Sequence, residues 1–136
     1  MTHTSAGVLW LVLFASVASP GGGQDAPPAP TIIHVVAERF SFFPSEITVD
    51  QGEVVELRIT SEDTSHGFRL VGPGAIDVEV PKRGRGEVKV RLEAAEPGDY
   101  TFECSRVCGA GHDFMRGTLR VKTRTDKAGG QDGGGL

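Results

Sequence analysis

Apolar and polar residues alternate along most of the chain between residues 32 and 122, with a period of two. This period is typical of strands that bury one face and expose the other. In the segment 54–61 (VVELRITS), the apolar residues Val55, Leu57 and Ile59 alternate with polar ones. His34 falls on a polar face and is expected to be solvated. The residues expected on the buried faces are Ile33, Val35, Ile47, Val49, Val55, Leu57, Ile59, Val88, Val90, Leu92, Leu119 and Val121.

Motifs rich in glycine and proline separate the alternating segments, and no window of the sequence shows the period of a long helix. Short strands at this spacing predict an all-β domain, namely an antiparallel sandwich or barrel. The turns are expected at residues 43–45, 50–52, 72–74, 81–86, 97–99 and 109–111.

The N-terminal part of the chain predicts export. Residues 8–18 are an unbroken apolar run, followed by a Gly/Pro-rich stretch. As a helix this run would span roughly 16 Å, against about 30 Å of bilayer hydrocarbon. We therefore expect a signal peptide or short anchor over 1–18 and a protein in the periplasm or on the outer face of the plasma membrane. The remaining divisions are a linker at 19–31, a folded domain at 32–122 and a disordered tail at 123–136.

Charge and composition exclude some partners. The chain has 136 residues and a formal net charge of −4, and its lysines and arginines are scattered. This charge opposes binding to nucleic acid and favours a basic protein partner. Two interpretations stay open for a group of acidic residues: a rim that steers a basic partner protein, or ordinary solvated surface. The group consists of Glu62, Asp63, Asp77 and Glu79.

The chemistry of the chain is concentrated in residues 104–115. Cys104 and Cys108 are its two cysteines, and His112 and Met115 follow at close spacing. Thiolate, imidazole and thioether together suit copper, for which a weak axial methionine is typical. Two thiolates leave room for a further ligand from elsewhere in the chain. His66, beside a glycine after a polar turn, is the candidate.

Simpler interpretations exist for each of these residues. Cys104 and Cys108 could form a disulfide in an exported protein. A disulfide that closes so short a loop adds little stability, and it leaves the spacing of His112 and Met115 unexplained. His66 alone would be a turn or core histidine, and Met115 alone would fill the core. Packing in the core is also the expectation for the phenylalanines Phe40, Phe42, Phe43, Phe68, Phe102 and Phe114. Phe68 and Phe114 flank proposed ligands, so the alternative for these two is that they shield the metal or lie on a path for electrons.

Three motifs together resemble one known family. They are Cys-x-x-x-Cys-x-x-x-His-x-x-Met at 104–115, Pro-Gly-x-Tyr-x-Phe-x-Cys at 97–104 and Asp-x-x-His-Gly-Phe at 63–68. The set resembles the CuA domain of cytochrome c oxidase subunit II. The resemblance implies a cupredoxin-like Greek-key β-sandwich that holds a binuclear CuA centre of two copper ions.

The same resemblance implies a ligand set. Cys104 and Cys108 would bridge both copper ions. The remaining ligands would be His66 and Met115 for one ion, and His112 and the backbone carbonyl of Arg106 for the other.

Three functions follow from this resemblance and from the composition. The first is electron transfer from a c-type cytochrome, or another small electron donor, to the catalytic subunit of a haem-copper oxidase. The second is a free-standing periplasmic cupredoxin that shuttles electrons. The third is a copper delivery or storage protein. Any membrane association is expected only through the short N-terminal segment. No pair of acid and base and no nucleophile arrangement indicates a catalytic site of the chain's own.

Overall fold

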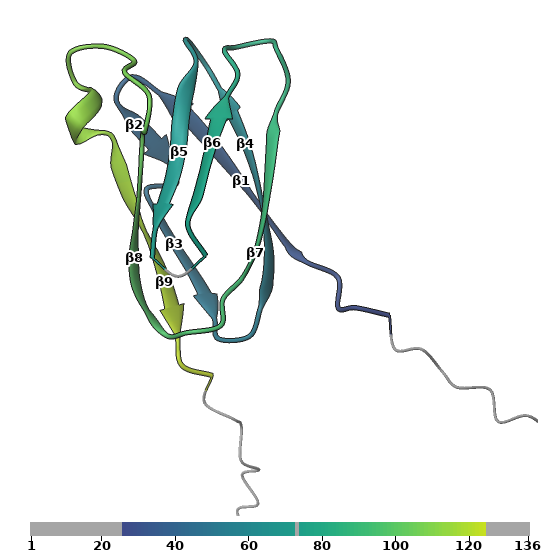
Figure 1. Ribbon diagram of the computed structural model, residues 1–136. Coiled ribbons are helices and arrows are strands. Elements are labelled where there is room, and N and C mark those ends of the chain that lie inside the picture. The colour runs from purple at the N-terminus through teal and green to yellow at the C-terminus, as the bar shows by residue number, and fades with distance from the viewer. Residues whose placement is uncertain (1–25, 73, 125–136) are drawn as a thin grey trace, which may run out of the picture.

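The computed structural model describes residues 26–72 and 74–124 (Figure 1). The expected signal or anchor at 1–18 lies outside the described residues, as do parts of the expected linker and tail. In the described part of the chain, no helix has the length and apolar character to cross a membrane. The elements are β1 (Thr31–Glu38), β2 (Ser41–Phe43), β3 (Glu46–Asp50), β4 (Val54–Ser61), β5 (His66–Val71), β6 (Ile76–Val80), β7 (Val88–Glu93), β8 (Gly98–Glu103), the 3-10 helix η1 (His112–Phe114) and β9 (Arg116–Lys122).

The strands form two sheets that pack face to face as a sandwich (Figure 1). One sheet has the strand order β2-β1-β4-β7, and the other has the order β3-β9-β8-β5-β6. The prediction of an all-β sandwich is confirmed. Side chains from the two inner faces share one core, as expected for stacked sheets.

The expectation of purely antiparallel pairing is wrong at two places. β1 pairs with β4, and β3 pairs with β9, in parallel. Parallel neighbours need a long crossover connection. Between β1 and β4 this connection consists of β2 and β3, because the chain leaves the first sheet after β2, forms β3 in the second sheet and returns as β4. The alternation of side chains reports which face a residue occupies, but not the direction of the neighbouring strand.

The predicted buried faces are confirmed. His34 is exposed, as predicted, on the opposite face of β1. Among the predicted inward residues, Ile33, Val88 and Leu92 are partly buried and pack against the core. The fully buried ones are Val35, Ile47, Val49, Val55, Leu57, Ile59, Val90, Leu119 and Val121.

Three phenylalanines form the centre of the core beneath one end of the sandwich. Phe42, Phe68 and Phe102 are buried, with ring centroids 5.3–5.7 Å apart. Phe68 lies two residues after His66, and Phe102 lies two residues before Cys104. Because side chains two residues apart along a strand share a face, these rings lie directly beneath the segments that carry the candidate ligands.

The other three phenylalanines that were predicted in the core are exposed, so that prediction is wrong for them. Phe43 is 74% exposed and follows Phe42 in β2, so the alternation that buries Phe42 turns Phe43 outwards. Phe114 is 80% exposed at the end of η1. Phe40 is 37% exposed and lies in the turn between β1 and β2.

Candidate metal centre

All the predicted ligands meet at one end of the sandwich. His66 begins β5, and Cys104 follows the last residue of β8. Cys108 lies in the loop after β8, His112 begins η1, and Met115 immediately precedes β9. Figure 1 shows this loop and η1 at the same end as the start of β5. Loops between strands can present several ligands in this way because the sheets hold their ends in place.

The two thiols form the middle of the cluster. Their Sγ atoms are 3.8 Å apart, well beyond the length of a disulfide bond, and both cysteines are free. On one side, Cys104 Sγ lies 3.9 Å from His66 Nδ1 and 3.1 Å from the carbonyl oxygen of Arg106. His66, Cys104 and Cys108 thus place their ligand atoms within 4.8 Å of one another.

The second thiol has its own neighbours. Cys108 Sγ lies 3.9 Å from His112 Nδ1 and 3.9 Å from Met115 Sδ. The two histidines therefore approach different sulfur atoms. Met115 is buried, whereas His112 is half-buried and lies nearer the surface.

Burial favours the protonated form of the Cys108 thiol. Cys104 and Cys108 are 5% and 6% exposed. Desolvation, reinforced by the neighbouring Cys104, raises the pKa of Cys108 to about 11. The thiol is therefore protonated at neutral pH in the copper-free protein. A metal ion that binds here has to displace protons, which couples metal uptake to proton release.

Asp63 fixes the orientation of His66. One carboxylate oxygen lies 2.7 Å from His66 Nε2 and accepts a hydrogen bond from its N–H. The hydrogen bond to His66 also helps to lower the pKa of Asp63, against an opposing effect of burial. With the proton on Nε2, the lone pair of Nδ1 faces Cys104 Sγ, as a ligating histidine requires. Sequence reasoning missed this role of Asp63, although the Asp-x-x-His spacing carried the signal.

Gly67 allows the ligand loop to pack tightly against β5. Its N–H donates to Cys104 Sγ over 3.4 Å. A Cβ atom at this position would lie 2.2 Å from Ser105 Oγ and within 2.9 Å of the backbone nitrogens of Ser105 and Arg106. Only glycine lets the backbone of the loop come this close.

The acidic residues near the site have polar partners. Two of the four carboxylates in the predicted rim pair with arginines, whereas the other two hydrogen-bond to an imidazole or a hydroxyl group. The pairs are Glu62 with Arg83, Asp63 with His66, Asp77 with Ser105, and Glu79 with Arg106.

The donor set fits copper and exceeds the needs of one ion. Two thiols, two imidazole nitrogens, one thioether and one carbonyl oxygen converge within a mostly buried cluster. Thiolate, imidazole and a weak thioether or carbonyl ligand are typical of copper electron-transfer sites. The buried Nδ1 of His66 supports this fit, because within the part of the chain that the structure describes its partner is a sulfur atom 3.9 Å away, too distant for a strong hydrogen bond.

Comparison with known proteins assigns the fold to a family. The model of the cupredoxin-like domain matches residues 5–121, so the chain belongs to the cupredoxin-like domain family. The predicted cupredoxin-like fold is thereby confirmed. The predicted resemblance to cytochrome c oxidase subunit II is confirmed as well. A cytochrome c oxidase subunit 2 from Thermus thermophilus is 42% identical over 91 residues, which are 66% of this chain and 64% of that protein.

Solved structures agree with this relationship. A haem-copper terminal oxidase dimer contains a chain that is 28% identical with a TM-score of 0.56, and the match covers 68% of this chain and 65% of that one. The periplasmic domain of subunit II of cytochrome oxidase from Bradyrhizobium japonicum has a TM-score of 0.62 at 21% identity, over 72% of this chain and 88% of that one. At this lower identity the likeness shows the fold alone. The chain spans less than two thirds of the length of the Thermus relatives.

Proposed function

We propose that this chain transfers single electrons through a binuclear CuA centre. The proposed ligands are the bridging thiolates of Cys104 and Cys108, with His66, His112, Met115 and the backbone carbonyl of Arg106 as the remaining ligands. The similarity to subunit II of cytochrome c oxidase supports this proposal. Copper held by these residues would supply the one-electron redox chemistry.

One observation carries the proposal: two thiols 3.8 Å apart have an imidazole nitrogen beside each of them. A mononuclear copper site needs one thiolate and two imidazoles, as in the blue copper proteins. Here the second thiol is equally buried and has its own histidine and thioether neighbours. A binuclear site uses both thiols, whereas a mononuclear site leaves Cys108 without a role.

The protein's own residues keep this site in place. Asp63 holds the His66 ring in the required tautomer, and the Gly67 N–H contributes a hydrogen bond to the sulfur of Cys104. Packed aromatic side chains beneath the site restrict its movement. A rigid site favours fast electron transfer, because little nuclear rearrangement accompanies the change of charge.

The surface around the ligands suits contact with a redox partner. Val107 is 87% exposed and precedes Cys108, and Phe114 is 80% exposed and precedes Met115. His112, half-buried between them in sequence, lies closer to solvent than His66. We propose that a c-type cytochrome or another small electron donor docks at this end, and that the acceptor is the catalytic subunit of a haem-copper oxidase.

The proposal extends to location. Because a solved domain of similar fold is periplasmic, and because the apolar run at 8–18 is followed by a Gly/Pro-rich stretch, we propose that the chain is exported. In this proposal, residues 1–18 act as a signal peptide or short anchor, 19–31 as a linker and 123–136 as a tail around the domain at 32–122.

The test is to express the full chain, reduce its thiols, load copper and measure the copper content together with the electron paramagnetic resonance spectrum. We expect two copper ions per chain and a spectrum in which one unpaired electron interacts with both copper nuclei. A Cys108→Ser variant is the matched control and should lose this spectrum. One copper ion per chain in the unmodified protein would refute the binuclear proposal.

Kinetics and partners then separate the three functions. Reduction by a c-type cytochrome and co-purification with a membrane oxidase support the subunit II role. Electron exchange without an oxidase partner indicates a free-standing shuttle. Rapid loss of copper to a mild chelator indicates delivery or storage and contradicts a buried electron-transfer site.

A further inference from the structure

The turn between β1 and β2 contacts both segments that carry the candidate ligands. This turn consists of Arg39 and Phe40 and belongs to the first sheet, whereas the ligands are attached to β5, β8 and β9 of the second. A contact between the turn and the ligands therefore bridges the two sheets. Nothing in the ligand motifs themselves points to this turn.

Arg39 contacts each ligand segment with a different group. Its side-chain Nε donates to the carbonyl oxygen of Cys108 over 2.9 Å. Its backbone N–H donates to the second carboxylate oxygen of Asp63, also over 2.9 Å. Asp63 in turn holds His66 through its other oxygen. One residue thus connects the bridging cysteine of the loop with the histidine of β5.

Phe40 supports the loop by packing rather than by hydrogen bonding. Its ring lies against Gly109 and Gly111, where an added Cβ would come within 2.9 Å and 2.3 Å of ring atoms. Gly109 also has a φ of +144°, a conformation that favours glycine. The ring therefore occupies the space that side chains at these two positions would need, between Cys108 and His112.

We propose that Arg39 and Phe40 are positioning residues that act as a clamp, holding the thiol of Cys108 and the imidazole of His66 in register with each other. The clamp acts on the free protein as well as on the copper-loaded one, because all of its contacts are made within the chain. The inference deepens the proposed function, and only its copper measurements rest on that function.

Without the clamp, the loop at 104–115 opens more often. The hydrogen bond from a charged guanidinium to a carbonyl is among the stronger ones in proteins. Its loss releases the backbone at Cys108, and loss of the Phe40 ring leaves Gly109 and Gly111 free to move. Opening exposes thiols that are 5% and 6% exposed in the closed loop. Their reaction with an alkylating agent then reports the population of the open state.

The first experiment uses the full chain, reduced and free of copper. We measure how fast iodoacetamide modifies Cys104 and Cys108 under native conditions in Arg39→Ala and Phe40→Ala. For Arg39→Ala we expect a rate about tenfold higher than in the unmodified chain, the order expected for loss of one charged hydrogen bond. For Phe40→Ala we expect a faster rate as well, because the ring no longer supports Gly109 and Gly111. The matched controls are Phe43→Ala, an exposed ring of β2, and Arg85→Ala, an exposed cation in the connection after β6. Both should alkylate at the unmodified rate.

A second measurement separates positioning from general stability. Phe40→Tyr keeps the ring, and Arg39→Lys keeps a charged donor, so both should restore slow alkylation. The clamp is refuted if the two alanine variants alkylate at the unmodified rate. It is also refuted if their faster alkylation only follows a lower melting temperature that the control variants share.

Copper loading adds the spectroscopic readout. In the alanine variants we expect copper to be lost to a chelator about 10–100-fold faster, as found when residues that orient metal ligands are removed, with an altered paramagnetic resonance spectrum. An unchanged spectrum and release rate contradict the clamp. If the unmodified chain binds no copper, the proposed function fails, and the alkylation rates still decide whether the clamp exists.

Discussion

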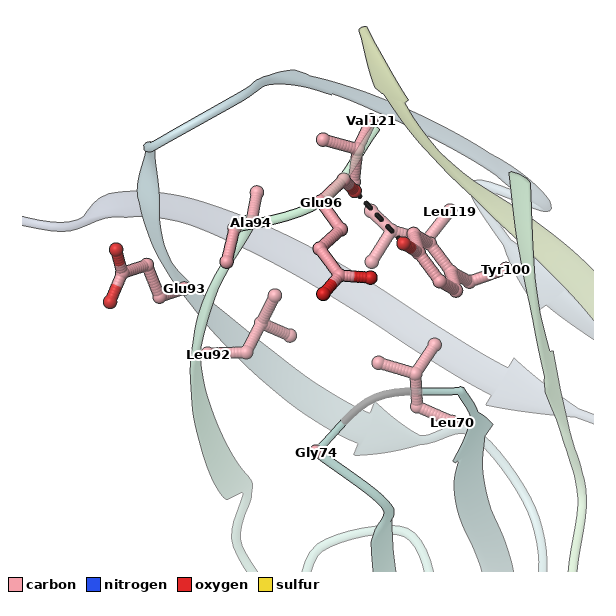
Figure 2. Close-up of a pocket in the computed structure, with 10 residues that line it drawn as sticks. Leu70, Gly74, Leu92, Glu93, Ala94, Glu96, Tyr100, Leu119 and Val121 are labelled. Carbon is pink, nitrogen blue, oxygen red and sulfur yellow. Dashed lines mark hydrogen bonds between the residues drawn. The ribbon is translucent and has the colours of Figure 1, made fainter. Parts of the chain in front are cut away.

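Both ends of the sandwich carry a pocket, but they differ in the packing beneath it. At the metal end the pocket has a volume of about 360 Å³ and borders Cys104, His112 and Met115. At the metal end, three aromatic rings contact one another beneath the ligands, and the loop approaches β5 so closely that position 67 admits no side chain. At the opposite end, an apolar cavity of about 240 Å³ lies between the ends of the strands (Figure 2).

The residues around this cavity come from both sheets. Figure 2 shows Leu92 and Leu70 pointing towards it, with Tyr100 at its side. The hydroxyl of Tyr100 donates to the carbonyl oxygen of Glu96 over 2.9 Å, which ties the turn before β8 to its strand. The remaining lining residues are Gly74, Glu93, Ala94, Ala95, Leu119 and Val121.

The contrast indicates that close packing is concentrated beneath the ligands and between the ligand loop and β5. Interiors at native density transmit small displacements, so a change near the ligands should alter the site. A cavity absorbs such displacements, so a change at the far end should affect stability without altering the site. The predictions below test this division, beginning with the largest effect.

Removing an aromatic ring from the metal end should have the largest effect. Phe68→Ala deletes a fully buried ring that contacts Phe42 and Phe102, and should lower the free energy of unfolding by about 3–5 kcal/mol. Leu92→Ala at the other end removes a partly buried side chain beside a cavity and should cost about 1–2 kcal/mol. Urea unfolding of the reduced, copper-free protein measures both. Equal costs would show that the two ends are packed alike.

Gly67→Ala should have the next largest effect. The added methyl group overlaps Ser105 Oγ and the backbone of the loop, so we expect a loss of about 1–3 kcal/mol and reduced copper content. Ser105→Gly in the same chain removes the hydroxyl but leaves the backbone nitrogens in place. The double variant should therefore recover only part of the stability. Full recovery would mean that the side chain of Ser105, rather than the backbone, causes the overlap.

Asp63→Asn should weaken copper binding without a large effect on the fold. The amide keeps the shape of the carboxylate but is a weaker acceptor for the His66 Nε2–H, so copper affinity should fall about tenfold. Competition with a chelator measures the affinity. Asp99→Asn is the matched control, because Asp99 pairs with Arg120 at 2.9 Å on the surface of β8, away from the ligands. A similar loss of affinity in both variants would argue against a specific role for Asp63.

Much of the fold followed from local pattern. The alternation in β4 and β9 predicted which side chains are buried because the period of a strand depends only on neighbouring residues. The spacing of Cys104, Cys108, His112 and Met115 likewise identified the ligand loop. His66 lies far away in sequence. Its place beside a glycine after a polar turn made it a candidate, and the resemblance to a known family strengthened that assignment.

The features missed by sequence reasoning depend on contacts between distant residues. The parallel pairing of β1 with β4 arises from the path of the chain through the other sheet. The contact of Arg39 with Cys108 joins positions 69 residues apart, and no motif marks it.

Two phenylalanines were misplaced for a local reason. Phe43 and Phe114 were expected in the core because aromatic residues are usually buried. Phe43 follows a buried neighbour in a three-residue strand, and Phe114 lies in η1.

Filling the cavity at the far end should produce the smallest effect, and it should be favourable. Leu92→Phe adds apolar surface where the structure has room, and should raise the free energy of unfolding by about 0.5–1 kcal/mol. The copper spectrum should not change, because the substitution lies at the opposite end from the ligands.

The matched control enlarges a residue at the packed end. Val80 is fully buried and pairs with His66 across β5 and β6, so Val80→Phe should cost about 1–3 kcal/mol and alter the copper spectrum. The same kind of enlargement would then have opposite signs at the two ends. If both substitutions destabilise the protein equally, the far end is as tightly constrained as the metal end, and its cavity is not free space into which a larger side chain can pack.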